Sequence, residues 1–63
     1  MKKKELKNLA KRIADAEYII QHSEDAKEVA RAQDRILELS GKVTSIEDMM
    51  AIDELVQEFL ENF

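Results

Sequence analysis

The chain has 63 residues, with 14 acidic against 10 basic side chains and a formal net charge of −4 at pH 7. It contains no cysteine and no proline, and glycine occurs once. A chain of this length can form one small domain, which we expect to span residues 1–63. Without cysteine it has no disulfide framework, so its stability must come from good helix packing or from association.

The distribution of apolar residues predicts neither a membrane span nor a secretion signal. The longest strictly apolar stretch runs from Met49 to Ile52, which is too short to cross a bilayer. The basic start MKKK is not followed by the apolar run of a signal peptide. We therefore expect a cytoplasmic protein with no membrane contact, encoded by a cell or by a phage. The abundance of Ala, Leu, Glu and Lys favours an all-α fold.

The first predicted helix covers residues 3–22. Its apolar side chains recur three and four positions apart, which places them on one stripe of a helix. The stripe consists of Leu6, Leu9, Ile13, Ala16 and Ile20.

A second helix is predicted over residues 24–40. The apolar stripes of the two segments are out of phase, because Ile20 and Val29 are nine positions apart rather than seven. A break near Ser23 restores the phase, with Ser23 as the N-cap and two acids in the first turn. A single long helix over residues 3–40 is the alternative. The second stripe consists of Val29, Ala32, Ile36, Leu39 and Val43.

The third helix is predicted over residues 45–62. Gly41 is expected to take the left-handed conformation that often follows a helix end. Two overlapping capping boxes come next, pairing Thr44 with Glu47 or Ser45 with Asp48. The apolar positions of this helix cover an arc of roughly 220°, much wider than the stripe of an ordinary surface helix. An apolar excess of this kind is typical of an interface.

Together the three segments predict an antiparallel three-helix bundle, in which the first and third helices run parallel. The alternative is a two-helix hairpin with a long first helix that dimerises into a four-helix bundle.

The third helix also supplies the candidate interaction surface. Methionine adapts to irregular partners and phenylalanine buries a large area, while an acidic face can engage a basic protein. The competing interpretation is that the apolar side chains form the core and the carboxylates form a solvated face. The protein-interaction candidates are Met49, Met50, Phe59, Phe63, Glu54, Glu58 and Glu61.

Charge is distributed unevenly along the chain. The first twelve residues carry six basic side chains and one acid, whereas residues 45–63 carry six acids and no base. Lys4, Lys7 and Lys11 fall on one helix face, with Arg12 at its edge, and such a row can neutralise phosphates. The row has no interleaved aromatic residues for base stacking. We therefore expect the charges to direct how helices pair, and a nucleic-acid accessory protein is the alternative.

No catalytic, cofactor-binding or metal-binding residue is predicted. His22 is the single histidine, which is too few for a zinc site, and is interpreted as a polar residue at a helix end. We expect a non-enzymatic helical module, a regulator, adaptor or inhibitor, that binds a protein partner or forms a homo-oligomer. A structural subunit of a larger assembly is a further alternative.

Overall fold

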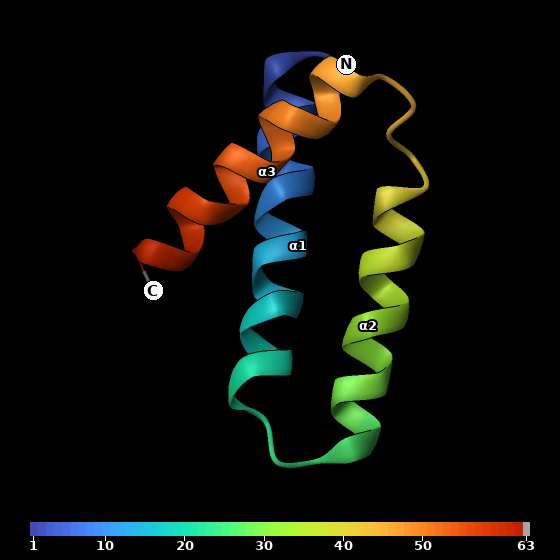
Figure 1. The fold of residues 1–63 in the computed structure, drawn as a ribbon, viewed down its shortest axis with the longest axis vertical. Helices are drawn as coiled ribbons and strands as arrows, with labels where there is room; N and C mark the ends of the chain where they lie inside the picture. The colour runs from blue at the N-terminus through green and yellow to red at the C-terminus, as the bar shows by residue number, and fades with distance from the viewer. Residues whose placement is uncertain (63) are drawn as a thin grey trace.

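The computed structural model describes residues 1–62 and contains there three α-helices and no strand. The helices are α1 (Lys3–His22), α2 (Ala26–Ser40) and α3 (Ile46–Glu61). α1 and α2 form an antiparallel hairpin, and α3 runs obliquely in the same general direction as α1 (Figure 1). The predicted all-α three-helix bundle is confirmed.

The helical conformation is interrupted between His22 and Ala26. This interruption excludes a single helix over residues 3–40, and with it the two-helix hairpin that has such a long first helix. Ser23 is the C-cap of α1 and not the N-cap of α2, so that prediction is wrong. The N-cap is Asp25, whose side chain accepts a hydrogen bond from the backbone nitrogen of Lys27. α2 therefore begins at Ala26 rather than at residue 24. A carboxylate is a stronger acceptor than a hydroxyl at the positive end of a helix.

The end of α2 also differs from its prediction. Gly41 has φ −64° and ψ −18°, in the right-handed region, so the predicted left-handed cap is wrong. Its backbone nitrogen donates to the carbonyl oxygen of Leu37 at 3.0 Å, and that of Lys42 donates to Leu39 at 3.2 Å. Because these bonds already satisfy carbonyl groups at the helix end, the chain needs no left-handed residue there.

Neither predicted capping box forms at the start of α3. Ser45 is the N-cap and makes no side-chain cap hydrogen bond, and Thr44 lies outside the helix. Oδ2 of Asp48 instead lies 3.2 Å from the ammonium nitrogen of Met1. This is the one ion pair among residues 1–62, so within the described chain no Lys or Arg of α1 forms an ion pair with an acid of α3.

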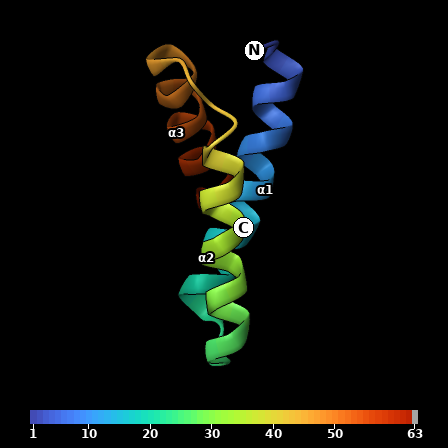
Figure 2. The same cartoon turned by 90° about the vertical axis from the view of Figure 1, so that its right-hand side faces the viewer.

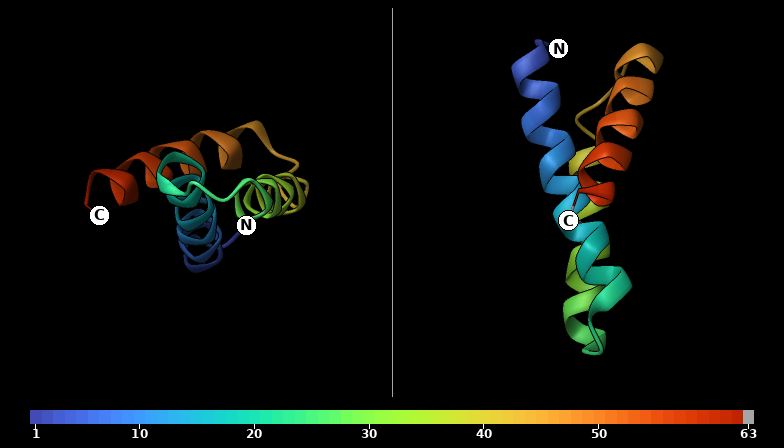
Figure 3. Two further views of the ribbon diagram at one scale, coloured as in Figure 1. Left: turned by 90° about the horizontal axis from the view of Figure 1, so that it is seen from below. Right: turned by 90° about the vertical axis from the view of Figure 1, so that its left-hand side faces the viewer.

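α1 is the central helix of the bundle. It packs against both α2 and α3, whereas no Cα atom of α2 lies within 8 Å of a Cα atom of α3. Figure 2 shows α2 in front of α1, and the view from below in Figure 3 shows α3 crossing α1 and moving away from α2 towards its C-terminal end. The fold therefore has two helix–helix interfaces rather than three.

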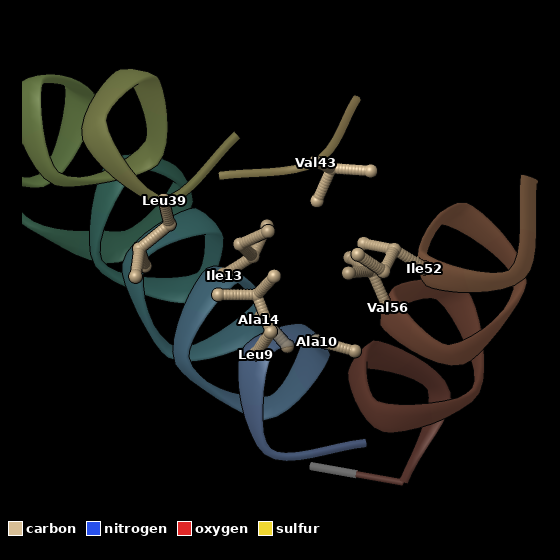
Figure 4. Packing of buried hydrophobic residues seen from close by; sticks show 8 residues of the cluster. All are labelled: Leu9, Ala10, Ile13, Ala14, Leu39, Val43, Ile52 and Val56. Carbon is tan, nitrogen blue, oxygen red and sulfur yellow. The ribbon is translucent and has the colours of Figure 1, made fainter. Parts of the chain in front are cut away.

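The hydrophobic core is small and aliphatic. Ala10 and Ala14 of α1 are 0% exposed, and Figure 4 shows Ala10 directed towards α3. Small side chains at a contact let two helix backbones approach closely. Among the described residues no large side chain is fully buried. The buried cluster consists of Leu9, Ala10, Ile13, Ala14, Leu39, Val43, Ile52 and Val56 (Figure 4).

Candidate protein-interaction surface

The N-terminal half of α3 exposes large apolar side chains. Ile46, Met49 and Met50 are 75%, 47% and 62% exposed. They are three and four positions apart, so they share one face of the helix. Ile52 and Val56 are buried in the core, and Met49, seven positions before Val56, lies at the border between these two residues and the exposed Ile46 and Met50. The apolar residues of this helix therefore divide into a buried face and an exposed face, and the exposed face is the apolar excess that the sequence indicates.

The structure separates the four apolar candidates named from the sequence. Met49 and Met50 belong to the exposed face. Phe59 is half-buried and packs against the core cluster, because it follows Ile52 by seven positions and falls on the same side of the helix. Phe63 lies outside the described residues. Only the two methionines are thus brought together on one open surface.

An acidic face continues from this apolar surface. Glu54, Glu58 and Glu61 are all exposed, and their spacing of four and three places them on one side of α3. Glu54 follows Met50 by four positions, so the carboxylates extend the line of the exposed apolar residues. The last turn of α3 contains no basic residue. The three acidic candidates therefore form a continuous negative surface beside the methionines.

A groove lies between α2 and α3, where the two helices do not meet. Its volume is about 590 Å³, and its floor is a row of α1 residues spaced four apart, Ile13, Glu17 and Gln21. We call this feature the α2–α3 groove. It is lined by Ile13, Glu17, Gln21, Ile36, Ser40, Val43, Met49, Ile52, Asp53, Val56, Gln57 and Leu60.

The α2–α3 groove combines an apolar base with negative charge. Ile13, Ile52 and Val56 contribute buried aliphatic surface. The charged residues that line it are Glu17 and Asp53, and no Lys or Arg is among the described residues of its wall. The groove is therefore suited to an apolar ligand that also carries positive charge.

None of the interaction residues predicted from the sequence lies on the α2 side of this groove. Leu37 is 73% exposed and precedes Ser40 by three positions, so the two residues share a side of α2. Leu37 thus adds exposed apolar surface to α2 outside the residues that line the groove. The sequence could have indicated the exposure of Leu37, because this residue lies off the apolar stripe that contains Ile36 and Leu39. The groove itself depends on how far α3 stands from α2, which helical periodicity does not report.

The basic candidates lie on α1, and all of them are exposed. Lys4, Lys7 and Lys11 form one row and make no ion pair within residues 1–62. Arg12 is separate from this row, because it lines a shallow depression against α2 together with acidic and basic side chains. The structure therefore brings three of the four basic candidates together.

The remaining features of the described chain are its single histidine, its carboxylates and the apolar character of its helices. His22 is the exposed last residue of α1, and its ring centroid lies 4.3 Å from that of Tyr18. Within residues 1–62 no three His, Cys, Asp or Glu side chains are placed to hold a metal ion. No helix of the described chain has the length and apolar character of a membrane span.

Comparisons with protein families, with curated proteins and with solved structures found no match for this chain. The functional proposal below is therefore based on the surface chemistry of the molecule.

Proposed function

We propose that this protein is a small, non-enzymatic helical interaction module of the cytoplasm, which acts as a regulator, adaptor or inhibitor by presenting α3 to a protein. The partner is another protein or a second copy of the chain. The observation that supports the proposal is the exposure of Ile46, Met49 and Met50 on one face of α3. Apolar side chains gathered on one face mark a protein contact more often than a solvated surface.

The magnitudes indicate how much surface such a contact must cover. Fully burying one large aliphatic side chain contributes about 1.5–3 kcal/mol, and these three side chains are already partly covered. Association costs on the order of 4–15 kcal/mol in lost freedom of motion. The three residues alone therefore support only a weak complex. A stable complex must also use neighbouring surface, and the α2–α3 groove, which Met49 lines, adjoins them.

Affinity capture with matched variants tests the proposal. The tagged wild-type chain, Met50→Glu and Asn8→Glu are compared in extracts of the source cells. Met50 lies on the exposed face of α3, whereas Asn8 is an exposed residue of α1 outside that face. Both variants add one negative charge, and only Met50→Glu places it on the exposed apolar face. We expect a partner that the wild type and Asn8→Glu retain and that Met50→Glu loses, with all three proteins equally helical by circular dichroism.

Self-association is measured separately by light scattering over a dilution series. A dimer that dissociates on dilution, and that Met50→Glu weakens at every concentration, identifies a second copy as the partner. A chain that stays monomeric and captures no protein contradicts the proposed function.

The exposed lysine row supports a second candidate function, that of a nucleic-acid accessory protein. Lys4, Lys7 and Lys11 lie on one face of α1 and are not paired with acids of the described chain. Phosphate contacts of this kind are strongest at low salt. Titration of duplex and single-stranded DNA and RNA at low salt is the test, and absence of binding there excludes this function.

A further inference from the structure

We propose that the α2–α3 groove accepts an amphipathic helix of another protein, whose apolar face is flanked by lysine and arginine. The inference builds on the proposed function and specifies the chemistry of the partner. It is carried by the shape of the groove, by the charge of its walls and by the charge at the end of α3.

The length of the groove along α3 is sufficient for a helix of three turns. Along α3 the lining residues run from Met49 to Leu60, a distance of about 17 Å or three helical turns at 1.5 Å per residue. The missing contact between α2 and α3 leaves an open side in the three-helix arrangement. A fourth helix laid along α1 would contact both outer helices and complete a four-helix packing.

Apolar side chains on both outer helices are placed to contact such a helix. Ile36 stands on the α2 side of the groove, and Met49 and Leu60 stand on the α3 side. Methionine side chains adjust to the shape of a partner and are common at surfaces that bind amphipathic helices. The buried aliphatic residues at the base then meet the apolar stripe of the incoming helix.

The charge of the walls selects a basic helix. Glu17 and Asp53 are the charged residues that line the groove, and the exposed Glu54 and Glu61 lie on α3 outside its lining. Arg35 of α2 and Lys42, just after α2, line the separate depression that Arg12 also lines. Lysine and arginine on the flanks of the occupant would therefore meet acids on the α1 and α3 sides of the groove, which guides orientation and speeds association.

The C-terminal end of α3 adds a second electrostatic preference. The carbonyl groups at a helix C-terminus carry partial negative charge, which favours nearby cations. α3 has Glu58 and Glu61 at this end and no basic residue in its last turn. The described part of α3 therefore has no cation to offset the negative charge at its C-terminal end. A lysine or arginine of the occupant would offset it.

A second copy of the chain fits these features less well. Its α3 would bring further carboxylates to an acidic groove. Its basic helix α1 already uses its apolar stripe against α2 and α3. The favoured occupant is therefore a helix from a different protein.

Fluorescence anisotropy with three synthetic peptides of about 18 residues tests the inference on the full chain, since shorter peptides form little helix in water. The first peptide carries leucines at helical spacing with lysines on both flanks. The second has the same composition in an order that destroys the apolar face. The third keeps the apolar face and replaces every lysine with glutamate. We expect the first to bind with a micromolar Kd and the other two to bind at least about tenfold more weakly.

Matched charge variants locate the binding site. The double variant Glu17→Lys with Asp53→Lys reverses the acids of the groove. The control, Asp34→Lys with Glu38→Lys, makes the same charge change at exposed positions of α2 outside it. We expect about a tenfold loss of affinity in the groove variant and less than about a twofold change in the control. Amide chemical shifts of Gln21, Ser40 and Gln57 should move on binding, while those of Lys4 and Lys7 should not.

Besides a failure of every peptide to bind, four results would overturn the inference. They are equal binding of the scrambled peptide, equal binding of the glutamate peptide, equal losses in the two double variants, and a wild-type dimer that occupies the groove and excludes the peptide. If no peptide binds while capture through Met50 persists, the inference fails and the proposed function stands. If capture fails as well, both are wrong.

Discussion

Oδ1 of Asp25 accepts a hydrogen bond from the backbone nitrogen of Lys27 at 3.0 Å, and this contact begins α2. Two residues earlier, Oγ of Ser23 accepts a hydrogen bond from the backbone nitrogen of Asp25 at 3.2 Å. The two bonds follow one another along the connection between α1 and α2. The first satisfies an amide of the helix itself, whereas the second only orders the segment before it.

This difference predicts unequal effects of the two side chains on stability. Asp25→Ala should lower the free energy of unfolding by about 1 kcal/mol, as expected for loss of an N-cap. Ser23→Ala should lower it by less, and Asp25→Asn should be nearly neutral because asparagine caps equally well. Urea denaturation followed by circular dichroism measures all three. A larger loss for Ser23→Ala than for Asp25→Ala would show that Ser23 is the cap after all.

The right-handed conformation of Gly41 predicts a stabilising substitution. A Cβ atom at this position would lie 3.4 Å from the carbonyl oxygen of Glu38 and 3.5 Å from that of Leu37, which is ordinary contact. Gly41→Ala should therefore raise the free energy of unfolding by about 0.4–1 kcal/mol, because alanine restricts the unfolded chain. Ala30→Gly, at an exposed position inside α2, is the reverse control and should lower it by about 1 kcal/mol. Destabilisation by Gly41→Ala would indicate a left-handed residue instead.

The close approach of α3 to α1 depends on small side chains. Ala10 is 0% exposed and is directed towards α3 (Figure 4), so Ala10→Leu should force the helices apart and cost about 1–3 kcal/mol. Ala30→Leu makes the same change at an exposed position of α2 and should be close to neutral. Thermal unfolding of the two variants measures the difference. Equal melting temperatures would mean that Ala10 is not a point of close packing.

Two isoleucines of α3 distinguish its buried face from its exposed face. Ile52 is 5% exposed and Ile46 is 75% exposed. Ile52→Ala should cost about 2–5 kcal/mol by leaving a cavity, whereas Ile46→Ala should change the stability by less than about 0.5 kcal/mol. If Ile52→Ala does not fold, Ile52→Val should still fold with a loss of about 0.5–1.5 kcal/mol. Comparable losses at both positions would contradict the orientation of α3.

Helix positions follow from the sequence because the three-and-four spacing of residues such as Leu9, Ile13, Leu39 and Ile52 is a strong local signal. The helix ends are harder to derive. Several polar side chains near each end, including Ser23 and Asp25, can accept hydrogen bonds from the same few backbone amides. The path of the chain determines which of them does so. Gly41 illustrates this, because a right-handed turn and a left-handed cap are both open to glycine.

The candidate surface is predictable only in part, for a related reason. The width of the apolar arc identifies Met49 and Met50 as candidates. It does not separate them from Phe59, because exposure depends on which side of α3 meets α1. The α2–α3 groove depends on the path of α3 across α1, which is favoured by alanines such as Ala10. Helical periodicity describes one helix at a time and contains no information on this path.

The central position of α1 has a consequence for the internal motions of the molecule. α2 and α3 each pack on α1 and not on one another, so either can lift away in a sub-global opening while the other stays in place. Amides of α1 lose their protection only when both outer helices have opened. Hydrogen exchange should therefore be slowest near the middle of α1, and faster in the two outer helices.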